Sequence, residues 1–261
     1  MTNLRNLRNE IQSGKKVCGT MFRMEHSPAA AYLVKNAGLD FFMLDCEHSN
    51  YDFETVHDMA VAANALGVLA FARVPEGTKA YVSRFLDMGI TGVMVPMVET
   101  PEQAENLVKW SKYPPLGGRG YTTTGPHTEF CTEPRHKEIM EEANGRILAI
   151  AQIETELGVK NADAIAAVEG IDVLLIGPND LSCSLGIPGD LFNPVELEAI
   201  AQVAAACHRH GKLFALHASQ KMQEKFADDI DFYMQGTDQD MLLGALKSVR
   251  TAADMLLEKK L

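Results

Sequence analysis

The sequence predicts an α/β fold, a single-domain (β/α)8 TIM barrel over residues 1–261. Short apolar segments alternate eight times with segments of helical character along the chain. A length of 261 residues is ordinary for one such barrel. An open doubly wound sheet is the alternative, but no Gly-x-Gly-x-x-Gly turn follows an early strand. We therefore favour the barrel.

The eight expected strands are nearly continuous in apolar residues. Strands buried on both faces have this pattern, which indicates a parallel sheet covered by helices. The expected strands lie within residues 17–22, 39–45, 68–73, 92–96, 147–153, 171–176, 213–217 and 230–235.

The segments between the strands carry helix start and stop signals. Residues 53–66 end at Gly67, and residues 78–88 end at Gly89. Thr100 followed by Pro101 is typical of a helix start, and residues 193–196 repeat the pattern. Earlier in the chain, Pro28 opens a helix that stops at Gly38.

Helices are also expected at both ends of the chain. Leu4, Leu7 and Ile11 have helical spacing and predict an extra helix before the first strand. A long C-terminal helix is expected from Asp238 to Lys259.

Residues 113–144 form the one long irregular stretch, rich in proline and glycine, with a short helix expected over 133–143. Loops of this length are commonly functional, so we expect this insertion near the active site.

Composition narrows the classes of partner. The chain has 35 Asp and Glu against 24 Lys and Arg, a formal net charge of −11. This charge repels phosphate backbones and anionic lipid, so we expect neither a nucleic-acid nor a membrane partner. No apolar run is long enough to span a bilayer, and the N-terminus does not resemble a signal peptide. Five scattered cysteines without CxxC spacing favour a reducing cytoplasm.

Polar side chains at the carboxyl ends of the expected strands are the candidate catalytic groups, because active sites of such barrels lie there. Glu154 and Asp180 are the candidate metal ligands, and two carboxylates completed by water suit Mg²⁺ or Mn²⁺. Gln152 shares a strand face with Glu154. A solvated strand-end carboxylate is the alternative for either acid taken alone.

Three further side chains could serve an acid–base reaction on a carboxylate substrate. His48 is a candidate base, which Asp45 could orient, although a single histidine is more often structural. Arg73 could bind a substrate carboxylate, or form a salt bridge with an acid such as Glu76. Asp87 on its own is typical of a solvated helix end. No expected strand ends in lysine, which argues against Schiff-base chemistry.

The sequence resembles the HpcH/HpaI family of metal-dependent (class II) pyruvate aldolases across nearly its whole length. The segments that carry the resemblance are LDFFMLDCEH at 39–48, ARVP at 72–75, LDMGITGVMVPM at 86–97, YPPLGGRG at 113–120, AQIET at 151–155 and GIDVLLIGPNDLS at 170–182.

The resemblance implies a role for each candidate residue. Glu154 and Asp180 would bind Mg²⁺, Mn²⁺ or Co²⁺. Gln152, Asn179 and the backbone around Asp180 would contact the pyruvoyl part of the substrate. Arg73 would stabilise the enolate.

The acid–base roles follow from the same resemblance. His48 would act as base through a water bound to the metal. Asp87 would raise the basicity of His48 from a neighbouring subunit, with Asp45 a second possible partner of that histidine.

The implied reaction is the cleavage or formation of 4-hydroxy-2-oxo acids by retro-aldol or aldol chemistry. Residues 120–130 depart from the usual family pattern, which leaves the acceptor half of the substrate open. The alternative is condensation of oxaloacetate with an acyl thioester, as in citrate formation for siderophore biosynthesis. The resemblance also implies a homo-oligomer, a trimer-based hexamer, in which the C-terminal helix takes part.

Overall fold

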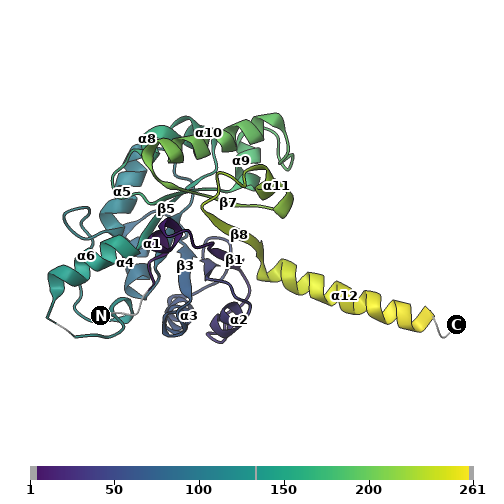
Figure 1. The fold of residues 1–261 in the computed structure, drawn as a ribbon, viewed down its shortest axis with the longest axis horizontal. Helices are drawn as coiled ribbons and strands as arrows, with labels where there is room; N and C mark the ends of the chain where they lie inside the picture. The colour runs from purple at the N-terminus through teal and green to yellow at the C-terminus, as the bar shows by residue number, and fades with distance from the viewer. Residues whose placement is uncertain (1–4, 133, 259–261) are drawn as a thin grey trace.

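The computed structural model describes residues 5–132 and 134–258 and has a closed barrel of eight parallel strands at its centre (Figure 1). Each strand pairs with its neighbours in sequence, and β8 pairs with β1 to close the ring. The strands are β1 (Cys18–Phe22), β2 (Phe41–Asp45), β3 (Leu69–Arg73), β4 (Gly92–Val95), β5 (Leu148–Ile153), β6 (Val173–Ile176), β7 (Leu213–His217) and β8 (Phe232–Thr237). The predicted (β/α)8 barrel is confirmed.

Helices surround the barrel and connect the strands (Figure 1). They are α1 (Leu7–Gln12), α2 (Ala30–Asn36), α3 (Phe53–Leu66), α4 (Lys79–Asp87), α5 (Pro101–Ser111), the 3-10 turn η1 (Pro126–Thr128), α6 (His136–Arg146), α7 (Glu156–Lys160), α8 (Ala162–Ala166), α9 (Pro178–Ser184), α10 (Pro194–His210), α11 (Gln220–Lys225) and α12 (Asp238–Glu258). Within residues 5–132 and 134–258, no helix is both long and apolar enough to cross a membrane.

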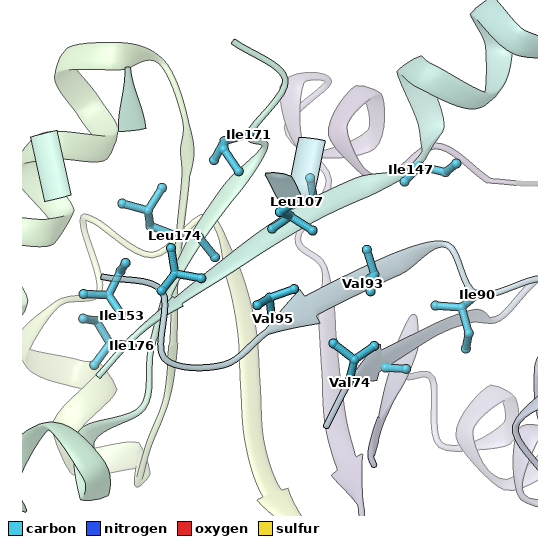
Figure 2. Close-up of a cluster of buried hydrophobic side chains, with 14 of the residues drawn as sticks. Val74, Ile90, Val93, Val95, Leu107, Ile147, Ile153, Ile171, Leu174 and Ile176 are labelled. Carbon is cyan, nitrogen blue, oxygen red and sulfur yellow. The ribbon is translucent and has the colours of Figure 1, made fainter. Parts of the chain in front are cut away.

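Side chains of each strand alternate between two packed layers. In β2, Phe41 and Met43 point into the barrel, where Phe41 stacks on Phe71 with ring centroids 4.8 Å apart. Phe42 and Leu44 point outward against the helices. Figure 2 shows part of the outer layer, with Val93, Val95, Leu107, Ile153, Leu174 and Ile176 in one cluster. Because both faces are covered, the strands are apolar at almost every position.

Capping residues hold the helix ends, among them the predicted Gly67 and Thr100. The Asp52 side chain accepts a hydrogen bond from the Thr55 N–H at 2.8 Å, and Gly67 ends α3 with a φ of 72°. Thr100 and Gln103 form a capping box at the start of α5. These bonds satisfy backbone groups that a helix end otherwise leaves unpaired.

The predicted N-terminal helix, α1, covers the amino end of the barrel. Leu7 is buried in the cluster that fills the barrel interior. The Asn6 side chain donates to the carbonyl of Gly145 at 3.0 Å, and Arg8 pairs with Asp172. Leu4 and Lys259, which were expected to begin and end the terminal helices, lie outside the described residues.

Residues 113–144 were expected near the active site, and within one chain they are not there. They lead from α5 into β5, so they lie at the amino ends of the strands, opposite the end that carries catalytic groups. Arg119 in this segment donates to Asp87 at the end of α4 with an N–O distance of 2.5 Å. The short helix expected at 133–143 is observed as α6, shifted by about one turn.

The C-terminal helix α12 projects from the barrel (Figure 1). None of its described residues is buried. Its large apolar side chains are exposed, namely Met241, Leu242, Leu243, Leu246, Val249, Met255, Leu256 and Leu257. A long exposed apolar surface is typical of a segment that contacts another protein surface.

Candidate active site

A pocket of about 500 Å³ opens at the carboxyl ends of the strands. Five of the predicted site residues line it, namely His48, Arg73, Gln152, Asn179 and Asp180. Asn179 and Asp180 do not extend β6 but form the first turn of α9, which begins at Pro178. The barrel therefore brings residues from four strand ends to one cavity.

Glu154 lies beneath the pocket wall, 2% exposed, and is held by two hydrogen bonds. Its Oε1 accepts from the Met97 N–H at 2.9 Å, and its Oε2 accepts from the Gln152 side-chain amide at 2.6 Å. Burial raises the pKa of Glu154 to about 7, and the negative charge of Asp180 contributes to the same rise. The two predicted metal ligands are therefore close enough to repel each other.

Gly177 permits this close packing. A Cβ on this residue would lie 2.6 Å from Gln152 Nε2 and 2.6 Å from Glu154 Oε2. Its φ of −102° and ψ of 92° are accessible to any residue, so the glycine is needed for space rather than for backbone conformation. Any larger side chain here displaces the Gln152–Glu154 pair.

The acidic pair fits a hard divalent cation. Repulsion from Asp180 and the cost of burying a charge both disfavour the ionised form of Glu154, and a bound cation would offset both effects. The buried Gln152 Oε1 has no hydrogen-bond partner among the described residues, and amide oxygens suit such ions or their water ligands. The same residues contain no group of three or more His, Cys, Asp or Glu placed to hold a metal. Two carboxylates completed by water and substrate are a usual arrangement for Mg²⁺.

Asp45 joins two arginines that line the pocket. This carboxylate is fully buried, and its Oδ1 accepts from Arg73 Nε at 2.9 Å. Its Oδ2 accepts from Arg23 Nε at 2.7 Å. The charge of Arg73 and the hydrogen bonds from both arginines hold the pKa of Asp45 below its ordinary value, against the effect of burial. The salt bridge that was considered for Arg73 therefore forms with Asp45 rather than with Glu76.

Glu47 is a second carboxylate on Arg73. Its Oε2 lies 3.1 Å from Arg73 Nη1 and 3.6 Å from His48 Nε2. Burial raises the pKa of Glu47, an effect that the charge of Arg73 opposes. Arg73 is thus locked by two acids and keeps its guanidinium at the pocket surface.

His48 has its imidazole half exposed at the pocket. Asp45 Oδ1 accepts from the backbone N–H of His48 at 3.2 Å, so Asp45 fixes the turn that carries the histidine. The expectation that Asp45 orients the imidazole itself is therefore wrong within this chain. The acid nearest to the ring is Glu47, which the sequence places directly before His48.

Asp87 does not join the pocket of its own chain. It ends α4 at the amino end of the barrel, where its carboxylate pairs with Arg119. The side chain of Asp87 is 40% exposed, whereas that of Arg119 is fully buried. Asp87 is therefore presented at the surface, where only another molecule could bring it close to a second His48.

Sequence reasoning assigned no role to Arg23 and His217, which line the pocket, or to Glu47, which contacts Arg73. Each lies at the carboxyl end of a strand, β1, β2 or β7. That position is the signal that could have identified all three.

Comparison with known proteins relates the whole chain to one group. Residues 19–243 match the family model described as HpcH/HpaI aldolase/citrate lyase. A 4-hydroxy-4-methyl-2-oxoglutarate aldolase from Hapsidospora irregularis is 34% identical over 262 residues, with 97% of this chain and 96% of that protein covered.

Two solved structures are also similar. The HpcH/HpaI aldolase from Desulfitobacterium hafniense DCB-2 has a TM-score of 0.88 and 32% identity, with 95% of this chain and 96% of that chain covered. The citrate synthase SbnG has a TM-score of 0.87 and 29% identity, with coverage of 97% and 99%.

Proposed function

The chain belongs to the HpcH/HpaI aldolase/citrate lyase family, and we propose that it is a divalent-metal-dependent aldolase that cleaves or forms 4-hydroxy-2-oxo acids. Its relatives include an aldolase named for a 4-hydroxy-2-oxo acid. The observation that carries the proposal is one pocket lined by Arg73, Asp180 and His48, with the buried Glu154 hydrogen-bonded to the pocket residue Gln152. Enolate formation requires positive charge near the developing oxyanion and a base near the substrate hydroxyl, and these residues would supply both.

The metal would be held by Glu154 and Asp180. Bound there, Mg²⁺, Mn²⁺ or Co²⁺ supplies Lewis-acid stabilisation for a 2-oxo acid. Gln152 and Asn179 both line the pocket and would bind the pyruvoyl oxygens.

Arg73 would stabilise the charge that develops during the reaction. When the C3–C4 bond breaks, its electron pair forms the enolate of pyruvate and negative charge grows on the former keto oxygen. Arg73 is 6% exposed and fixed by Asp45 and Glu47, so its guanidinium needs little reorganisation. A preorganised cation stabilises this charge more in the transition state than in the ground state.

His48 would accept the proton of the 4-hydroxyl group in the cleavage direction. The C4–O bond then becomes the carbonyl of the released aldehyde or ketone. In the reverse direction His48 returns the proton. Its half-exposed position at the pocket rim gives the proton a path to water.

Pyruvate release from 4-hydroxy-2-oxo acids tests this proposal. We expect activity to be lost on exhaustive chelation and restored by Mn²⁺ or Co²⁺, and we expect no trapping by borohydride. Glu154→Gln should abolish the metal-dependent rate, while Glu156→Gln, an exposed acid on the adjacent helix, should leave it unchanged. Activity that survives chelation would contradict metal dependence.

A thioester-dependent synthase is the second candidate, because the citrate synthase SbnG is similar over nearly the whole chain. Such an enzyme would condense oxaloacetate with acetyl-CoA, a reaction used in siderophore biosynthesis. Release of free CoA thiol on mixing the two substrates would identify it, and pyruvate release from 4-hydroxy-2-oxo acids without thiol release would exclude it.

We also propose that the chain works as a cytoplasmic homo-oligomer, a trimer-based hexamer. The exposed apolar surface of α12 would pack on a second copy, and Asp87 would reach His48 of a neighbouring copy. The five cysteines are all free, which fits a reducing compartment. Light scattering on the full chain tests the assembly, and a monomer at micromolar concentration would contradict it.

A further inference from the structure

Polar groups from β1, β7 and β8 also line the pocket. These strands are consecutive in the ring, and β1 lies opposite β5, the strand that leads to Glu154. The group includes Arg23, His217 and Gln235. The pyruvoyl half of a substrate already has its partners at β3, β5 and β6, so these groups face the other half.

Arg23 is held in place by its Nε, while its terminal nitrogens remain available as hydrogen-bond donors. Its Nε donates to Asp45 at 2.7 Å, and its side chain is 32% exposed in the pocket. Its two terminal nitrogens have no hydrogen-bond partner among the described residues. The backbone of the turn is fixed by Asp238, whose carboxylate accepts from the N–H groups of Arg23 and Met24 at 2.9 Å each.

His217 contributes a neutral acceptor beside this cation. Burial lowers the pKa of His217, and the charges of Arg73 and Arg23 lower it further. Its Nε2 lies 3.2 Å from the carbonyl oxygen of Gly236, which assigns the ring hydrogen to Nε2 and a lone pair to Nδ1. The nearby acid Asp240 is engaged with the Thr237 hydroxyl at 2.8 Å. Arg23 is therefore the charged donor on this side of the pocket.

Asp45 sets the spacing between the two arginines. Its two oxygens contact Arg73 and Arg23 separately, so the guanidiniums are neighbours. A substrate bound at Arg73 therefore has a second, neighbouring guanidinium within the same pocket. Glu47 adds a second negative charge at Arg73, whereas Asp45 is the one acid within salt-bridge distance of Arg23 among the described residues.

Resting on the proposed function, we propose that Arg23 binds a carboxylate at the end of the acceptor half. One relative is named for an acid with a second carboxylate, 4-hydroxy-4-methyl-2-oxoglutarate, so the new assignment here is the residue, Arg23, that would bind this group. The planar guanidinium fork matches such a group, and Arg23 determines specificity without touching the reacting bond.

Two matched pairs of aldehydes test this assignment in the condensation with pyruvate. The pairs are glyoxylate with isobutyraldehyde and succinic semialdehyde with 4-methylpentanal, in which an isopropyl group replaces the carboxylate. We expect wild-type kcat/KM to favour the carboxylate in at least one pair. Arg23→Met should reduce that preference by about 10- to 100-fold, mainly through KM, as expected for the loss of a charged hydrogen bond.

Control variants separate binding from a structural effect. Arg23→Lys should keep part of the preference. Arg209→Met, which removes an exposed arginine paired with Asp163, should keep all of it. If Arg23→Met lowers the rates of both aldehydes of a pair equally, Arg23 serves only to hold Asp45 and the assignment is wrong.

Exchange of the pyruvate methyl protons in heavy water distinguishes the two proposals, because it needs only the pyruvoyl half. If the wild type exchanges these protons but shows no preference for carboxylate aldehydes, the assignment of Arg23 fails and the proposed function stands. If neither exchange nor condensation occurs, the proposed function fails and this inference fails with it.

Discussion

Gly177→Ala is the sharpest perturbation of the proposed metal site, because it adds one methyl group beside both Gln152 and Glu154. The new Cβ would lie 2.6 Å from an atom of each, whereas ordinary contact begins near 3.4 Å. The pair must therefore move by about 0.8 Å, a displacement near the 1 Å that can cost about 100-fold in rate. We expect kcat/KM for pyruvate release to fall by about 100-fold and the affinity for Mn²⁺ to fall with it.

The backbone at Gly177 accepts alanine, so the fold should survive. Thermal unfolding monitored by circular dichroism checks this, and titration calorimetry with Mn²⁺ measures the metal affinity. Gly145→Ala is the matched control, since its Cβ would have only an ordinary contact at 3.8 Å. Wild-type turnover and Mn²⁺ affinity in a folded Gly177→Ala protein would refute the role assigned to the Gln152–Glu154 pair.

Three further predictions follow from buried charges and from the position of Asp87. Burial raises the pKa of Glu196 from 4.5 to about 7, so this group should lower the free energy of unfolding by up to about 3 kcal/mol as the pH rises through this range; urea titrations should show a smaller fall in Glu196→Gln, in which Glu154 still contributes. Asp45→Asn should lower the free energy of unfolding by about 3 kcal/mol, because it leaves two arginines without their buried counter-charge; an unchanged urea midpoint would contradict this. Mixing and reassembling the inactive variants His48→Ala and Asp87→Asn should restore part of the aldolase rate if the two residues meet between subunits, whereas no recovery would place Asp87 outside the site.

The barrel could be predicted because its signals are local. Each strand needs a short apolar run that is buried on both faces, and each helix end needs a capping group such as Gly67 or Thr100. The site residues at strand ends could be found for the same reason, since the carboxyl ends of parallel strands meet at one edge.

The contacts between these residues could not be read from the sequence. Asp45 was expected to orient the imidazole of His48, but its oxygens are taken by two arginines and a backbone N–H. Strand position brings such groups together, while side-chain direction and competition among donors decide which of them pair. Arg23 directly follows β1, a position that marks a strand end, but its pairing with Asp45 depends on side-chain direction.

Residues 113–144 show a second limit. Their length indicated function, but their place after α5 puts them at the amino end of the barrel. A loop's length says nothing about which end of the barrel it occupies, whereas its order between a helix and a strand does. Arg119 in this segment contacts Asp87. The segment would therefore support catalysis only in the active site of a neighbouring copy, which Asp87 is proposed to reach.

The most direct test of the central claim is a crystal soaked with Mn²⁺ and oxalate, a planar mimic of the pyruvate enolate. Anomalous scattering should show one strong manganese peak between the carboxylates of Glu154 and Asp180, with oxalate against Arg73. A manganese peak elsewhere, or none at saturating concentration, would contradict the account.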